Sequence, residues 1–147
     1  MQTERPMRGR QRARELLVQA LYQWQLTDQQ SDELLVQFSA RTEFLRIDQI
    51  YFRELFSAVL CDFKDLDALI SEHADWDHDQ LDAVSRAVLL LSLSEFKSRF
   101  EVPTKVVINE AVELAKRYGP PDSFRFINAV LDSAAKKVGR GSELGQT

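Results

Sequence analysis

The chain has 147 residues, with 19 lysines and arginines against 23 aspartates and glutamates, and a formal net charge of −4. It contains only 5 glycines and 4 prolines, and none of either lies between residues 10 and 102. Sandwiches, barrels and hairpins rely on these residues at tight turns, so the composition argues against a β fold. The glycine-rich phosphate loops are also absent from the sequence. We therefore expect an all-α protein.

The first half of the chain predicts a basic arm followed by three helices. Residues 1–9 are expected to form a disordered arm, and a helix begins near Arg10, where apolar residues start to recur at helical spacing. A short helix is predicted over residues 32–41, and Asp48 is a plausible N-cap for a long third helix. An apolar, largely aromatic face is expected along this third helix: Phe52, Leu55, Phe56, Val59, Leu60 and Phe63.

A central helix is the main expectation for the second half. Residues 71–80 form the most polar interior segment and predict a hinge or loop, after which a helix runs over residues 81–99. Residues 87–91 are apolar on every side, which is typical of a helix buried all round.

Two further helices are predicted before the C-terminus. Pro103 suits the first turn of one, and Gly119 suits its end. Asp122 or Ser123 is expected to cap the last helix, and Gly139 to end it. We expect one domain over residues 10–138 and a disordered tail over residues 139–147.

The charge is distributed unevenly along the chain. Residues 1–14 carry a net charge of +4, residues 136–147 carry +2, and the 121 residues between them carry −10. Within this acidic body, residues 62–82 contain eight acids and one lysine. A basic arm favours nucleic acid, and an acidic segment favours a basic partner.

Catalytic and metal-binding patterns are weak in this sequence. His73 and His78 lie among acidic residues, but a solvated loop explains them better than a metal site. The pair Glu110 and Glu113 is better explained as a solvated helix face than as acid–base machinery. The single cysteine, Cys61, is predicted to be a small buried hydrophobe and fits a reducing compartment. We predict no enzyme activity, metal, cofactor or membrane span, and a cytoplasmic location.

Five arginines within ten residues give the strongest signal. Guanidinium groups bind phosphates, and Arg10, Arg14 and Tyr22 lie along one flank of the first predicted helix. Cations beside an aromatic ring are typical of single-stranded RNA binding. A solubilising tail is the alternative interpretation.

Four segments resemble the NusB family of bacterial transcription antitermination factors. They are RGRQRARELLVQALYQWQ, DQIYFRELFSAV, RAVLLLSLSEF and VPTKVVINEAVELAKRYGPPDSFRFINAVLD, which match in order and spacing. The resemblance implies a fold of about seven helices in two packed three-helix halves. It also implies binding of boxA-type single-stranded RNA from ribosomal RNA operon leaders, together with NusE, a small-subunit ribosomal protein. With other Nus factors, this complex would promote read-through by RNA polymerase.

The resemblance also assigns site residues. RNA contacts are implied at Arg8, Arg10, Arg12, Arg14, Tyr22, Asp122, Arg125 and Phe126. A NusE-facing surface is implied at Asp79, Asp82 and Ser85. Two alternatives are a non-catalytic protein–protein adaptor that uses its acidic face, and a NusB-like module related to RNA methyltransferases. Chain length argues against the second, because 147 residues leave no room for a cofactor-binding α/β domain.

Overall fold

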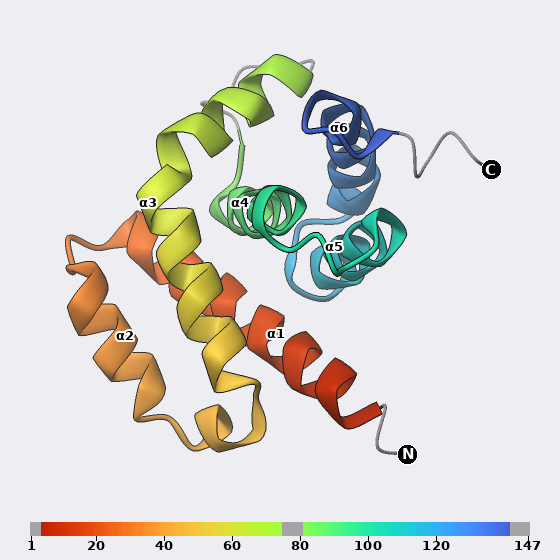
Figure 1. The fold of residues 1–147 in the computed structure, drawn as a ribbon. Coiled ribbons are helices and arrows are strands. Elements are labelled where there is room, and N and C mark those ends of the chain that lie inside the picture. Colours follow the sequence, from red (N-terminus) through yellow and green to blue (C-terminus); the bar gives the residue numbers. More distant parts are fainter. Residues whose placement is uncertain (1–3, 75–80, 142–147) are drawn as a thin grey trace.

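The computed structural model describes residues 4–74 and 81–141, with side chains from residue 8 onward. Over these ranges it contains six α-helices, one 3₁₀ helix and no strand, which confirms the predicted all-α class (Figure 1). The elements are α1 (Glu4–Leu26), α2 (Ser31–Ser39), η1 (Thr42–Arg46), α3 (Gln49–His73), α4 (Ala83–Ser98), α5 (Thr104–Tyr118) and α6 (Ser123–Lys137). No helix in this part of the chain combines the length and apolar character that a membrane span requires.

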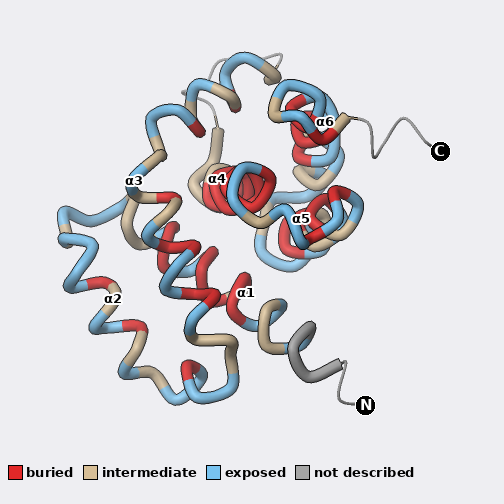
Figure 2. Tube along the Cα trace, in the orientation of Figure 1, coloured by how far each residue is buried: buried red, intermediate tan, exposed pale blue. Residues whose placement is uncertain are grey.

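Helix α4 forms the centre of the protein. Every residue from 87 to 96 is buried, and the helix packs against α1, α3, α5 and α6 (Figure 2). Two halves of three helices, α1–α3 and α4–α6, therefore meet mainly at α4, and α3 also packs against α6. Each leucine that it buries contributes roughly 1.5–3 kcal/mol relative to an exposed side chain. The prediction of a central helix buried all round is confirmed.

The helix ends follow local sequence signals. The Asp48 carboxylate accepts a hydrogen bond from the Tyr51 N–H at 3.0 Å, so Asp48 caps α3 as predicted. At the end of α6, Gly139 adopts a left-handed conformation with φ of 85°, and the Arg140 N–H donates to the Ala135 carbonyl at 2.7 Å. This closure satisfies carbonyls that the helix leaves free, and it needs a residue that tolerates positive φ.

The predicted disordered arm over residues 1–9 is wrong from Glu4 onward, because α1 begins there. Pro6 lies in the first turn of α1, where the N–H that proline lacks has no helical partner in any case. Gly9 then lets the helix approach the start of α3 closely. Its carbonyl accepts a hydrogen bond from the Asp48 N–H at 3.0 Å, and a Cβ at position 9 would lie only 3.3 Å from that nitrogen.

The predicted tail from residue 139 also begins too early, because Arg140 is buried. Its guanidinium donates to the carbonyls of Phe96 at 3.0 Å, Val102 at 2.6 Å, Glu95 at 3.1 Å and Arg99 at 2.8 Å. Arg140 therefore satisfies carbonyls at the C-terminal end of α4 and in the loop that follows. The folded domain extends through this residue, and residues 142–147 lie outside the described range.

Cys61 is exposed on α3, although we expected it to be buried. The buried face of this part of α3 is formed by Phe56, Val59 and Leu66. Val59 follows Phe56 by three positions and Leu66 follows Val59 by seven, so the three residues share one face of the helix. Position 61 falls on the opposite side.

Candidate nucleic-acid interface

Helix α1 has a buried apolar face and, on its other side, an exposed polar stripe. Leu17, Ala20 and Leu21, which recur at the spacing of one helix face, are fully buried. Arg8, Arg12 and Gln19 are exposed on the opposite side. This exposed stripe of α1 contains two of the four arginines that were predicted to contact RNA.

Arg14 does not belong to the exposed stripe, and its predicted role as an RNA contact is wrong. Only 3% of the residue is exposed. Its guanidinium Nη2 lies 2.8 Å from the Glu95 carboxylate, and its Nε donates to both carboxylate oxygens, at 3.1 and 3.0 Å. The Tyr51 hydroxyl donates to the same carboxylate. Because Arg14 balances a buried charge, it is not accessible to a phosphate group.

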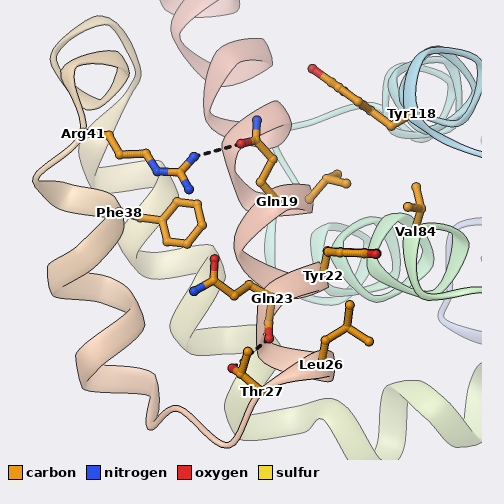
Figure 3. Close-up of a pocket in the computed structure, with 10 residues that line it drawn as sticks. Gln19, Tyr22, Gln23, Leu26, Thr27, Phe38, Arg41, Val84 and Tyr118 are labelled. Atoms are coloured by element: carbon orange, nitrogen blue, oxygen red, sulfur yellow. Dashed lines mark hydrogen bonds between the residues drawn. The ribbon is translucent and has the colours of Figure 1, made fainter.

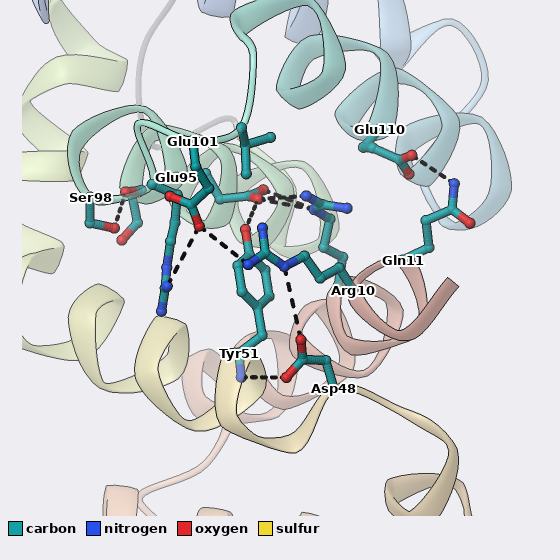
Figure 4. A network of polar contacts seen from close by, with 12 residues as sticks. Arg10, Gln11, Asp48, Tyr51, Glu95, Ser98, Glu101 and Glu110 are labelled. Atoms are coloured by element: carbon teal, nitrogen blue, oxygen red, sulfur yellow. Dashed lines mark hydrogen bonds and ion pairs between the residues drawn. The ribbon is translucent and has the colours of Figure 1, made fainter. Parts of the chain in front are cut away.

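Arg10 lies at the edge of this buried network. Its guanidinium lies 4.4 Å from the centre of the Tyr51 ring, 3.9 Å from the Asp48 carboxylate and 3.2 Å from the Glu101 carboxylate (Figure 4). The side chain is 30% exposed. Burial, together with the adjacent Glu95, raises the pKa of Tyr51. These contacts hold the first half of α1 against α3, α4 and the loop after α4.

Tyr22 lines a groove at the other end of α1. The groove has a volume of about 450 Å³, and Val18, Phe38, Val84 and Tyr118 also line it (Figure 3). Tyr22 is 41% exposed and Tyr118 is 37% exposed. Tyr22 follows Arg10 by twelve positions along the helix, which is a rise of roughly 18 Å.

Tyr118 is a groove residue that was not predicted from the sequence. Its spacing with Val107, Ala111 and Leu114 predicts an inward-facing position on α5. It ends the helix, next to the C-cap Gly119, and therefore projects beyond the core. The position of an aromatic residue in the last turn, before Pro120, is the signal that could have identified it.

The predicted residues at the start of α6 lie just beyond Tyr118. Asp122 adopts a left-handed conformation with φ of 66° and makes no side-chain cap. Its carboxylate lies 3.6 Å from the Arg125 guanidinium, and both side chains are exposed. Phe126 is half-buried against the core. Asp122 follows Tyr118 by four positions, so their Cα atoms are at most roughly 15 Å apart.

Phe124 takes part in this cluster as well. The Lys116 ammonium lies 5.0 Å from the centre of its ring, and the Arg125 guanidinium lies 5.2 Å from it. The ring is half-buried, so the core takes part of it and two cations cover another part. This arrangement places two positive charges beside the groove end of α5.

The predicted partner surface is only partly present. Asp82 caps α4 by accepting a hydrogen bond from the Ser85 N–H at 2.9 Å. Ser85 is 1% exposed, so the expectation that it faces a protein partner is wrong for this conformation. Asp79 lies outside the described residues.

The acidic side chains of α3 are largely neutralised within the chain. Asp62 pairs with Lys97 at 2.6 Å, Asp67 with Arg86 at 2.5 Å, and Glu72 with Lys137 at 3.1 Å. All three bases lie on α4 or α6. These three acids therefore join the two halves of the fold and are already paired with bases of the same chain.

The residues considered for a metal site or for paired-carboxylate chemistry make hydrogen bonds and ion pairs within the chain. His73 Nδ1 lies 2.7 Å from the Ser133 hydroxyl, whereas His78 lies outside the described residues. Glu110 accepts a hydrogen bond from the Gln11 amide at 2.8 Å, and Glu113 lies 3.8 Å from the Lys116 ammonium. Within the described ranges, no group of three potential ligands is arranged to hold a metal ion.

The sequence and the fold were compared with those of known proteins. The family model described as "NusB family" matches residues 11–136. The chain is 44% identical to "Transcription antitermination protein NusB" of Pseudoalteromonas translucida over 130 residues, which cover 88% of this chain and 96% of that protein. It is 45% identical to the protein of the same name from Yersinia pestis, with coverage of 88% and 94%. The solved structure of T. maritima NusB superposes with a TM-score of 0.79 at 28% identity, covering 92% of this chain and 96% of that one. The chain therefore belongs to the NusB family.

Proposed function

We propose that this protein is a non-catalytic transcription antitermination factor that binds boxA-type single-stranded RNA together with NusE. The observation that carries the proposal is the exposed stripe of α1, in which Arg8 and Arg12 lead toward the aromatic groove at Tyr22 and Tyr118. Arginines can bind the phosphates while a base stacks on an aromatic ring, which is how many proteins hold single strands. The names of the relatives support the role in antitermination.

Within this proposal, the RNA contacts are Arg8, Arg12, Tyr22, Asp122, Arg125 and Phe126, with Arg10 at the margin. Asp122 has no positive charge to offer a phosphate, but its carboxylate can accept hydrogen bonds from base edges. For NusE we propose the start of α4 at Asp82. The complex would act with other Nus factors on RNA polymerase, and no step requires a cofactor.

The test is RNA binding by point variants, measured as fluorescence anisotropy of a labelled boxA-type RNA with and without NusE. Tyr22→Ala should weaken binding by about 1–3 kcal/mol if a base stacks there, whereas Tyr22→Phe should retain most of the affinity. Arg12→Gln should also weaken binding. Lys136→Gln removes an exposed charge near the C-terminal end of α6 and serves as the control.

Substitutions are preferable to deletion of residues 1–14, because deletion would leave Glu95 buried without Arg14. Circular dichroism should show each variant to be folded. Equal affinities for Tyr22→Ala, Arg12→Gln and the unaltered protein would refute the proposal. A protein that binds NusE but shows no RNA binding under any condition would favour the adaptor alternative.

A further inference from the structure

The exposed stripe of α1 faces a second wall, formed by η1 and the residue after it, Ile47. A groove of about 250 Å³ runs between α1 and η1, and its lining includes Arg12, Glu15, Gln19, Glu43 and Arg46. Neither Arg46 in this groove nor Arg41, the residue before η1, belongs to the RNA contacts proposed above. This groove between α1 and η1 is polar, unlike the aromatic groove at Tyr22.

The two grooves form one continuous surface. Gln19 lines both of them, and it accepts a hydrogen bond from the Arg41 guanidinium at 2.9 Å. Arg41 in turn lies over the Phe38 ring, 4.0 Å from its centre, at the wall of the aromatic groove. A strand that stacks a base on Tyr22 can therefore continue over Gln19 and Arg41 toward Arg46.

The electrostatics of the groove between α1 and η1 favour an anion. Arg12 and Arg46 are exposed, and in the part of the chain that the structure describes neither makes an ion pair. The Glu15 carboxylate is already held by the Arg117 guanidinium at 2.6 Å. In the lining of this groove, two arginines, Arg12 and Arg46, thus stand beside a single carboxylate that makes no ion pair with any described residue, that of Glu43.

This local excess of positive charge contrasts with an acidic body of net charge −10. We infer that the groove between α1 and η1 binds the phosphodiester backbone of single-stranded RNA on one flank of the bases held at Tyr22, with Arg46 as a phosphate contact. The inference rests on the proposed function. Guanidinium forks match phosphate oxygens in geometry, and their exposure leaves the donors available.

The experiment compares two RNAs. One contains only the boxA-type element, and the other carries the same element with about six unstructured nucleotides on each side. Binding of each is measured by anisotropy between 50 and 200 mM salt, for the unaltered protein and for Arg46→Gln. Arg53→Gln is the matched control, because Arg53 is an exposed arginine on α3 that lines a different groove, together with Cys61 and Arg99.

Loss of one phosphate contact should reduce the slope of log affinity against log salt by about 0.7. The ratio of the two proteins' affinities should then shrink by about 2.6-fold between 50 and 200 mM salt. We expect this effect for Arg46→Gln with the longer RNA and not for Arg53→Gln. The same effect with the short RNA would also support the phosphate contact, and would place it within the element.

An unchanged slope for Arg46→Gln with both RNAs would overturn the inference. So would a variant that binds RNA normally but associates less well with NusE, because the groove would then face a protein. Failure of the proposed function looks different. In that case the unaltered protein itself would bind neither RNA, or Tyr22→Ala would bind both of them normally.

Discussion

Replacing Arg14 by methionine should destabilise the protein severely without removing an RNA contact. The substitution takes away every hydrogen bond that Arg14 donates to Glu95 and leaves a carboxylate that is 1% exposed, with the Tyr51 hydroxyl as its remaining side-chain donor. Breaking a buried ion pair in this way costs about 3–5 kcal/mol. That is a large part of the roughly 5–15 kcal/mol by which a typical domain is stable.

The assay is urea denaturation followed by circular dichroism at 222 nm. With a slope of about 1–3 kcal/mol per molar urea, the midpoint should fall by roughly 2 M. Arg12→Met is the matched control, because Arg12 is exposed on the same helix and its replacement should change stability by less than about 0.5 kcal/mol. The two variants should also differ in RNA affinity, because Arg12→Met should weaken binding and a folded Arg14 variant should not.

A combined variant tests the physical reason. Arg14→Met, Glu95→Leu and Tyr51→Phe together replace the buried polar groups by apolar ones, which is often nearly neutral. Most of the lost stability should return, and RNA affinity should remain. The reasoning would be refuted if Arg14→Met cost less than about 1 kcal/mol, or if the stable combined variant lost RNA binding as Arg12→Met does.

Two further predictions concern stability. Arg140→Ala should lower the free energy of unfolding by about 3 kcal/mol and the melting temperature by roughly 10 °C, because four carbonyl acceptors lose a charged donor; a loss below about 1 kcal/mol would show that water replaces the guanidinium easily. The raised pKa of Tyr51 keeps its phenol protonated in the fold, whereas an unfolded tyrosine ionises near pH 10. The contribution of Tyr51 to the free energy of unfolding is therefore fully present below about pH 10 and is lost as pH rises above that value. Urea titrations at about pH 8 and pH 11 should show that the free energy of unfolding falls more between these pH values for the unaltered protein than for Tyr51→Phe. Equal decreases would contradict the raised pKa of Tyr51.

Local signals in the sequence predicted the start of α3 and the end of α6. Asp48 caps α3 through its side chain, and Gly139 ends α6 through a left-handed backbone conformation. Both contacts involve residues only a few positions away, so neighbouring positions in the sequence are enough to predict them. The apolar run at residues 87–91 likewise predicted the central helix, because no helix that faces water on one side would carry it.

The errors arose where a distant partner decides the role of a residue. Nothing in the arginine spacing distinguishes Arg14 from Arg12, because the carboxylate that buries Arg14 belongs to Glu95, 81 positions away. The sequence around Arg140 predicts a basic tail, whereas carbonyl acceptors in and after α4 hold its guanidinium in the fold. In each case the positive charge was visible in the sequence, and the tertiary contact that uses it was not.

The burial of α4 on all sides has a consequence for synthesis on the ribosome. Helices α1 and α3 leave the ribosome first, yet the surface that covers their apolar faces is completed by α4, which ends at Ser98. Nascent chains shorter than this must hold those faces exposed to water, where chaperones or other nascent chains can bind them. The N-terminal half therefore requires a helix from the C-terminal half before it can fold stably.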